Sequence, residues 1–179
     1  MKIMQYGLSG GLLSALLSVL AVLVVAPAVK AEEGQTELET LAVEKTIFLA
    51  ATPLEQGMSI DNIEIVVDLR YPYEGVYDEL GMLKQKGIRS LNIPVSSRGP
   101  SAENLESLAI ALQDAGTQNV LIHDSNGYRT AMLWAAYRLS QGVTIEMAVE
   151  EVETLYDDQE LKSELERISR RLASVNLDS

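Results

Sequence analysis

The chain has 179 residues and a formal net charge of −12, with 26 Asp and Glu against 14 Lys and Arg. A protein this acidic is poorly suited to binding nucleic acid or anionic lipid. It contains no cysteine, which excludes disulfides, zinc–thiolate sites and a thiol nucleophile.

Residues 1–31 have the pattern of a signal peptide, with Lys2 at the start, an apolar run at 12–25 and a small residue, Ala31, at the end. We predict cleavage after Ala31 and a periplasmic protein of 148 residues. Its net charge would be −14, because Lys2 and Lys30 are removed and no acid is. The apolar run is shorter than the roughly 20 residues that span a bilayer. An uncleaved membrane anchor is therefore the less favoured alternative. We expect the chain to contact a membrane only through such an uncleaved signal segment.

A polar, flexible lead-in is expected at 32–43, followed by one domain at 44–156. The first expected strand, 46–51, stops at a proline, and residues 53–56 are a candidate short helix because proline suits the first helical position. The run 63–69 is almost wholly apolar and rich in β-branched residues. This composition predicts a parallel strand that is covered on both faces.

The remaining elements alternate between strands and helices. In chain order we expect a loop at 71–77, a helix at 78–86, a strand at 88–95, a loop at 96–100, a helix at 101–116, a strand at 120–123, a helix through 131–137 and a helix at 144–155. This spacing predicts an α/β fold with a three-layer arrangement, in which helices flank a central, mainly parallel sheet of four to five strands.

The segment 157–179 is predicted to form a C-terminal amphipathic helix. Its apolar residues recur at spacings of four, three and four, which places them on one stripe: Leu161, Leu165, Ile168 and Leu172. We expect this stripe to pack on the domain. Dimerisation or docking onto another protein is the alternative.

The segment 120–130 is the strongest candidate for a functional site. A buried strand turns through a Ser/Asn/Gly loop directly into a helix, so that backbone N–H groups point at one position in front of the positive end of the helix. Such a turn binds anions. The candidate anion-binding loop comprises Asp124, Ser125, Asn126, Gly127, Tyr128, Arg129 and Thr130.

This segment resembles the signature His-Cys-x-x-Gly-x-Arg-Thr/Ser of the protein tyrosine/dual-specificity phosphatase-like superfamily, in the form seen in beta-lactamase-hydrolase-like phosphatases and rhodaneses. The matching residues are His123, Gly127, Arg129 and Thr130, and Asp124 stands where the family has its nucleophilic cysteine. Further matches extend the resemblance over roughly residues 43–155: Val66–Arg70, Gly87–Val95, Trp134–Arg138 and Gly142–Thr144. The resemblance implies a phosphatase-like fold, in which Arg129 grips phosphate oxygens and His123 orients the loop.

The residue types in the loop argue against the chemistry of that family. A carboxylate at Asp124 supplies a built-in anion that competes with phosphate for the loop N–H groups and for Arg129. The family's general acid would fall in the loop 96–100, which has no Asp or Glu, although Glu74 or Asp78 is a conceivable substitute. We therefore expect neither a cysteine-type phosphatase nor a sulfurtransferase.

Three arginines follow expected strands and are predicted to meet at one edge of the sheet: Arg70 and Arg98 at the rim of an anion pocket, and Arg129 in the loop. The alternative is that Arg70 and Arg129 are structural and pair with carboxylates, which would be Asp68, Glu74 or Asp124. His123 and Asp68 are expected to be structural. A metal site of His123, Asp68 and Asp124 is a weaker alternative, and we expect no metal or cofactor.

Together these features predict an exported pseudophosphatase that acts as a binding or regulatory module for a protein partner or a small anion. Tyr71, Tyr73 and Tyr77 are candidates to wall the pocket or to contact a partner. The alternative is a phosphatase or other hydrolase in which Asp124 is a metal-assisted nucleophile.

Overall fold

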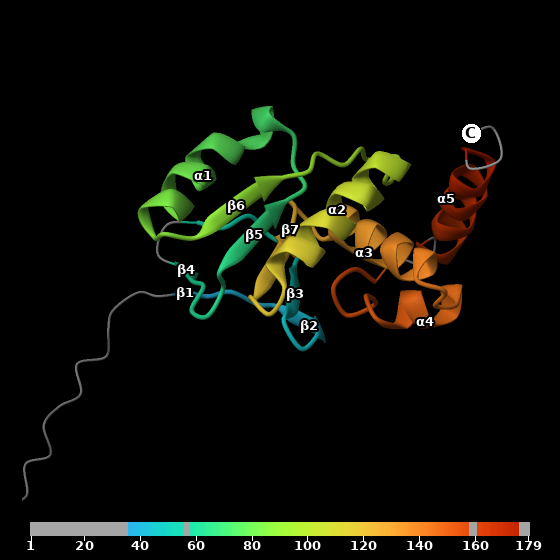
Figure 1. Ribbon diagram of the computed structural model, residues 1–179, viewed down its shortest axis with the longest axis horizontal. Coiled ribbons are helices and arrows are strands. Elements are labelled where there is room, and N and C mark those ends of the chain that lie inside the picture. The colour runs from blue at the N-terminus through green and yellow to red at the C-terminus, as the bar shows by residue number, and fades with distance from the viewer. Residues whose placement is uncertain (1–35, 56–57, 158–160, 176–179) are drawn as a thin grey trace, which may run out of the picture. The chain divides into compact units, whose positions relative to one another are not determined.

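The computed structural model describes residues 36–55, 58–157 and 161–175 (Figure 1). The predicted signal peptide at 1–31 lies outside these residues. Within them, no helix is long and apolar enough to cross a membrane.

The central sheet has five strands in the order β2-β3-β7-β5-β6. Four of them run parallel, and β2 pairs antiparallel with β3 at one edge. These strands are β2 (Leu41–Glu44), β3 (Ile47–Ala50), β5 (Ile65–Asp68), β6 (Arg89–Asn92) and β7 (Val120–His123). A separate parallel pair is formed by β1 (Thr36–Glu37) and β4 (Met58–Ser59). The mixed α/β architecture with a mainly parallel five-stranded sheet confirms the predicted fold class.

Helices cover both faces of the sheet. They are η1 (Pro72–Glu74), α1 (Val76–Gln85), α2 (Ala102–Ala115), α3 (Tyr128–Ser140), α4 (Ile145–Glu150) and α5 (Leu161–Val175). In Figure 1, α3, α4 and α5 gather together, away from α1. The two faces follow from the strand period of two, because successive side chains point to opposite sides.

The alternation is clear in the buried strands. Ile65, Val67 and Ile122 belong to the larger apolar cluster, on which α2, α3, α4 and α5 pack. Val66 and Leu121, their neighbours in sequence, belong to a smaller cluster closed by Leu83 of α1 and by the N-terminal segment. The strands β5 and β7 are buried at every position, as expected for central parallel strands.

Several local predictions differ from the structure. The predicted lead-in 32–43 contains β1 and nearly all of β2, so the folded part begins before residue 44. Residues 53–55 are not helical. The N–H of Leu54 donates to Glu79 Oε2 at 3.1 Å, and the Leu54 side chain is buried. The predicted loop 71–77 contains η1 and the start of α1, which Gly75 joins with a left-handed φ of 88°.

The C-terminal helix α5 lies on the domain through the apolar stripe. Leu161, Leu165 and Ile168 are each at most 2% exposed. On its polar side, α5 also contacts the loop after β6, because Arg167 donates to the carbonyl of Arg98 at 3.3 Å and Arg171 donates to that of Pro100. The side chain of Leu172 is not among those described.

Candidate functional site

The loop between β7 and α3 lies at the carboxyl edge of the parallel strands. His123, the last residue of β7, is in register with Ala50 of β3 and with Asp68 of β5. The chain then turns at Gly127, whose φ of 85° is left-handed and favours glycine, and enters α3 at Tyr128. The helix is buried from Arg129 to Ala136, so the loop is anchored between a central strand and a central helix.

The carboxylate of Asp124 fills the centre of this loop. The residue is 0% exposed. Its Oδ1 accepts hydrogen bonds from Gly127 N at 2.9 Å and Thr130 Oγ1 at 2.8 Å. Its Oδ2 accepts from the backbone N and the Nε of Arg129, at 3.3 and 3.2 Å. The loop donors that converge on this position therefore bind an anion that belongs to the chain itself.

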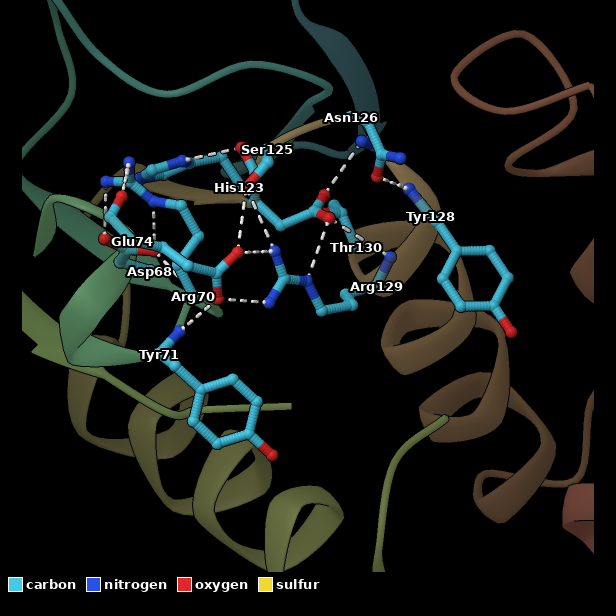
Figure 2. Close-up of polar contacts among 12 residues, drawn as sticks. Asp68, Arg70, Tyr71, Glu74, His123, Ser125, Asn126, Tyr128, Arg129 and Thr130 are labelled. Atoms are coloured by element: carbon cyan, nitrogen blue, oxygen red, sulfur yellow. Dashed lines mark hydrogen bonds and ion pairs between the residues drawn. The ribbon is translucent and has the colours of Figure 1, made fainter. Parts of the chain in front are cut away.

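A second carboxylate, from Glu74 of η1, takes the outer end of Arg129. The guanidinium donates from Nη1 to Oε2 and from Nη2 to Oε1, both at 2.8 Å, in a two-point ion pair. Tyr71 N donates to Oε2 at 2.7 Å and Ser125 Oγ to Oε1 at 3.3 Å. Figure 2 shows the Glu74 carboxylate meeting the Arg129 guanidinium, with Tyr71 and Ser125 beside it.

These contacts fix the charge of both partners. The hydrogen bonds from Arg129 lower the pKa of Glu74 to about 2 against the opposing effect of burial, and the N–H of Tyr71 contributes further. The bonds to Glu74, and then those to Asp124, raise the pKa of Arg129 above its ordinary value. Arg129 is thus a permanent cation, and its guanidinium is held between the carboxylates of Glu74 and Asp124.

A buried ionic cluster lies beside the loop. Arg70 donates from Nε to Asp68 Oδ1 at 3.0 Å, from Nη2 to Asp68 Oδ2 at 2.8 Å, and from Nη2 to Glu79 Oε2. The Oε1 of Glu79 lies 2.7 Å from Nε2 of His123, and neither atom has another hydrogen-bond partner. All four residues are at most 5% exposed.

The donor set of this cluster partly fits a metal. Asp68, Glu79 and His123 each offer one ligand atom within 4.8 Å of the others, and nitrogen with carboxylate oxygen suits a divalent transition ion. However, Arg70 already binds both oxygens of Asp68 and one of Glu79, so the cluster holds its own cation. This arrangement fits an internal ion network better than a metal centre. Asp124 is not part of this set, unlike in the alternative metal site that the sequence suggested.

The predicted rim of arginines is not assembled. A cavity of about 360 Å³ opens in front of the loop, and Arg129 is the only arginine among its described lining residues, which are Tyr71, Tyr73, Glu74, Ser97, Ser125, Asn126, Tyr128 and Arg129. Arg70 turns instead into the buried cluster and is 4% exposed. Arg98 is exposed and lies on the loop that contacts α5. The pairing of Arg70 and Arg129 with Asp68, Glu74 and Asp124 matches the structural alternative.

Glu79 is the residue of this region that the sequence predictions missed. It lies in α1 at a spacing of three from Val76 and four from Leu83, and these are the three buried residues of the helix. Because residues at these spacings share one helix face, a carboxylate on the buried stripe was a detectable signal for an internal ion pair.

No protein-family model and no curated protein matches this chain. Solved structures with a similar fold include Tk-PTP in its active form, at 23% identity and a TM-score of 0.58, covering 74% of this chain and 97% of that one. The kinase associated phosphatase, with its catalytic-site cysteine changed to serine, gives 18% identity, a TM-score of 0.59 and coverage of 78% and 98%.

The core catalytic domain of the PP-IP phosphatase Siw14 from S. cerevisiae, in complex with citrate, gives 19% identity, a TM-score of 0.58 and coverage of 80% and 96%. Each of these chains is matched along nearly its whole length. The likeness confirms that the chain has the fold of the protein tyrosine and dual-specificity phosphatases.

Proposed function

We propose that this chain is an exported pseudophosphatase, a domain with a phosphatase-like fold that does not turn over phosphate esters and acts by binding a protein partner. The observation that carries the proposal is the double occupation of the loop. The carboxylate of Asp124 accepts the hydrogen bonds of the converging loop donors. The carboxylate of Glu74 accepts two hydrogen bonds from the guanidinium of Arg129.

The geometry at Asp124 does not suit a nucleophile. In the family that the loop resembles, a thiolate at this position attacks phosphorus and the arginine grips the phosphate oxygens. Here both oxygens of Asp124 accept hydrogen bonds from the loop or from the first turn of α3, and the residue has no exposed surface. An incoming phosphate dianion would have to displace Glu74 and would then face Asp124 at close range, where like charges repel.

A metal would be required to make Asp124 a nucleophile, because the phosphate charge must be neutralised. Among the described residues, the one group of acidic and histidine side chains close enough to hold an ion is Asp68, Glu79 and His123, which does not include Asp124. No observation therefore favours the metal-assisted hydrolase.

The same electrostatics favour a protein partner over a small anion. Around the loop, Asp124 and Glu74 outnumber Arg129, so this region carries a negative charge where an anion would have to bind. Export is supported by the composition of residues 1–31, with a positive start, an apolar run and a small residue at the predicted cleavage position.

The test is hydrolysis of an aryl phosphate by the purified protein, with and without Mg²⁺ or Mn²⁺. We expect no turnover above that of buffer with the same metal. Turnover that depends on the metal and disappears in Asp124→Asn would overturn the proposal and make Asp124 the nucleophile.

Two variants separate the effects of the two carboxylates. Asp124→Cys supplies the thiol of the family, and Asp124→Cys with Glu74→Gln also releases Arg129. We expect the double variant to hydrolyse the aryl phosphate faster than the single one, because Glu74 no longer competes for the guanidinium. Thermal unfolding of each variant checks that it is folded. Equal rates in folded single and double variants would show that Glu74 does not block the loop.

A further inference from the structure

The segment Tyr71–Glu79 carries exposed side chains that take no part in the loop contacts described above. Its sequence, YPYEGVYDE, contains three tyrosines and three carboxylates and no basic residue. Tyr73 and Tyr77 are 83% and 72% exposed, and they are two of the four large exposed hydrophobic residues in the described part of the chain. Exposed aromatic side chains gathered on one segment are typical of binding surfaces. We call this segment the tyrosine ridge.

Residues of the ridge line two cavities. The cavity of about 360 Å³ in front of the loop is lined on this side by Tyr71, Tyr73 and Glu74. A larger cavity of about 570 Å³ is lined on this side by Gly75, Tyr77, Asp78 and Glu79. Its other lining residues come from the segments after β3 and β5 and from the rest of α1: Pro53, Leu54, Glu55, Arg70, Gly81, Met82 and Gln85. A ligand that contacts the ridge could therefore place side chains in either cavity.

Carboxylates outnumber cations in the lining of the larger cavity, and around the smaller one when the buried Asp124 is counted. In the larger one, Glu55, Asp78 and Glu79 stand against Arg70, and the Arg70 guanidinium is already bound to Asp68 and Glu79. In the smaller one, Arg129 is bound to Glu74, with Asp124 directly behind it. The exposed charges at the larger cavity, Glu55 and Asp78, are both carboxylates.

The first residues of the ridge are held in place by contacts within the domain. Arg70 donates from Nη1 to the carbonyl of Glu74 at 3.2 Å, and Tyr71 N donates to the Glu74 carboxylate. The rings of Tyr71 and Tyr73 stack at 5.5 Å with an angle of 5° between their planes. A surface whose side chains are fixed before binding loses less conformational entropy when a partner docks.

We propose that the tyrosine ridge is the docking surface for a basic segment of a partner protein, whose Arg or Lys side chains enter the two flanking cavities. Aromatic faces attract guanidinium and ammonium groups, and the surrounding carboxylates complement their charge. The aliphatic stems of such side chains match the apolar walls that Leu54 and Met82 give to the larger cavity. This inference deepens the proposed function and rests on its premise that the domain acts by binding.

The test measures binding of a fluorescent peptide of alternating arginine and glycine to the purified protein, by fluorescence anisotropy. A peptide of alternating glutamate and glycine is the comparison. We expect the basic peptide to bind, the acidic one not to bind, and the affinity to fall when salt is raised from about 0.02 M to about 0.5 M.

Matched variants locate the site. Tyr73→Ala with Tyr77→Ala is expected to weaken binding by at least about tenfold, and Asp78→Asn by a smaller factor. The controls on α2 remove an exposed apolar side chain and an exposed charge elsewhere, in Ile110→Ala and Glu106→Gln, and should leave the affinity unchanged. All these residues are exposed, so the variants should fold.

Equal weakening by ridge and control variants would mean that the peptide does not bind specifically at the ridge, and would overturn the proposal. Preference for the acidic peptide, or no binding of the basic one, would do the same. None of these outcomes bears on catalysis, which the aryl phosphate assay tests separately.

Discussion

At the scale of single residues, Glu74 covers the solvent-facing end of the Arg129 guanidinium. The carboxylate of Glu74 accepts two hydrogen bonds of 2.8 Å from Arg129, and the Glu74 side chain is still 25% exposed. The sequence left three carboxylates open as partners for the arginines, because Glu74 and Arg129 are 55 positions apart and no local pattern joins them. Only the tertiary structure selects Glu74, by bringing η1 to the edge of the sheet where β7 ends.

The pairing of Glu74 predicts a defined pH dependence of stability. The pKa of Glu74 falls from an ordinary 4.5 to about 2 on folding. A carboxyl whose folded pKa is depressed contributes stability above its unfolded pKa, and this contribution is lost as the pH falls toward the folded value. We expect Glu74→Gln to lower the free energy of unfolding by about 1–2 kcal/mol at pH 7, allowing for solvent screening. The difference from the wild type should shrink between about pH 4.5 and pH 2.

Urea unfolding of both proteins at several pH values measures this difference. Glu106→Gln, on the exposed side of α2, is the matched control and should show no such trend. A difference between wild type and Glu74→Gln that stays constant down to pH 2 would contradict the proposed ion pair.

At the scale of elements, the loop between β7 and α3 is tightly packed against neighbouring segments as well as hydrogen-bonded. A Cβ atom added at Gly127 would lie 2.9 Å from the Cβ of Ala51, after β3, and 3.1 Å from the carbonyl oxygen of Leu155, after α4. The glycine that the signature shares with phosphatases is therefore needed here for packing between elements, in addition to its φ of 85°. Such a requirement is a property of the fold and does not need catalysis.

Gly142 offers a matched comparison for this packing. Its φ is 88°, close to that of Gly127, but an added Cβ would meet no heavy atom within 4 Å. Both Gly→Ala changes carry the cost of a left-handed residue, about 1–2 kcal/mol. We expect Gly127→Ala to cost about 1–3 kcal/mol more than Gly142→Ala, because it also crowds Ala51 and Leu155. Thermal and urea unfolding of the two variants would measure the difference, and equal costs would show that the loop can relax.

At the scale of the whole molecule, the predictions succeeded where the pattern of the sequence is set by burial. The apolar runs around β5 and β7 identified the central parallel strands, and the 3.6-residue period identified α2 and the stripe of α5. The edges were harder to predict. The strand β1 has only two residues, and its partner β4 lies about 20 residues further along the chain. The strand β2 pairs with the adjacent β3, but none of its residues is buried, so it lacks the burial pattern of a central strand.

The site was predicted only in part. Its loop is continuous in sequence, so the residues Asp124–Thr130 could be recognised together, with a carboxylate at the centre. The prediction of an arginine rim assumed that side chains at strand ends point into one pocket. This assumption fails for Arg70, whose guanidinium forms ion pairs with the buried carboxylates of Asp68 and Glu79 and does not line the loop.

The position of the N-terminal domain boundary gives a last prediction. The sequence placed the start of the domain at residue 44, whereas Leu38 is 8% exposed in the smaller apolar cluster and Leu41 pairs with Leu49 across the β2–β3 ladder. A chain that begins at Glu32, the residue after the predicted cleavage, retains all these contacts. A chain that begins at Lys45 loses β1, β2 and the burial of Leu38, which alone contributes about 1.5–3 kcal/mol. We therefore expect the Glu32 chain to unfold at the same urea concentration as the protein purified after export, and the Lys45 chain to unfold at a clearly lower one. Equal midpoints for the two truncated chains would mean that residues 36–44 are dispensable and that the domain begins where the sequence alone placed it.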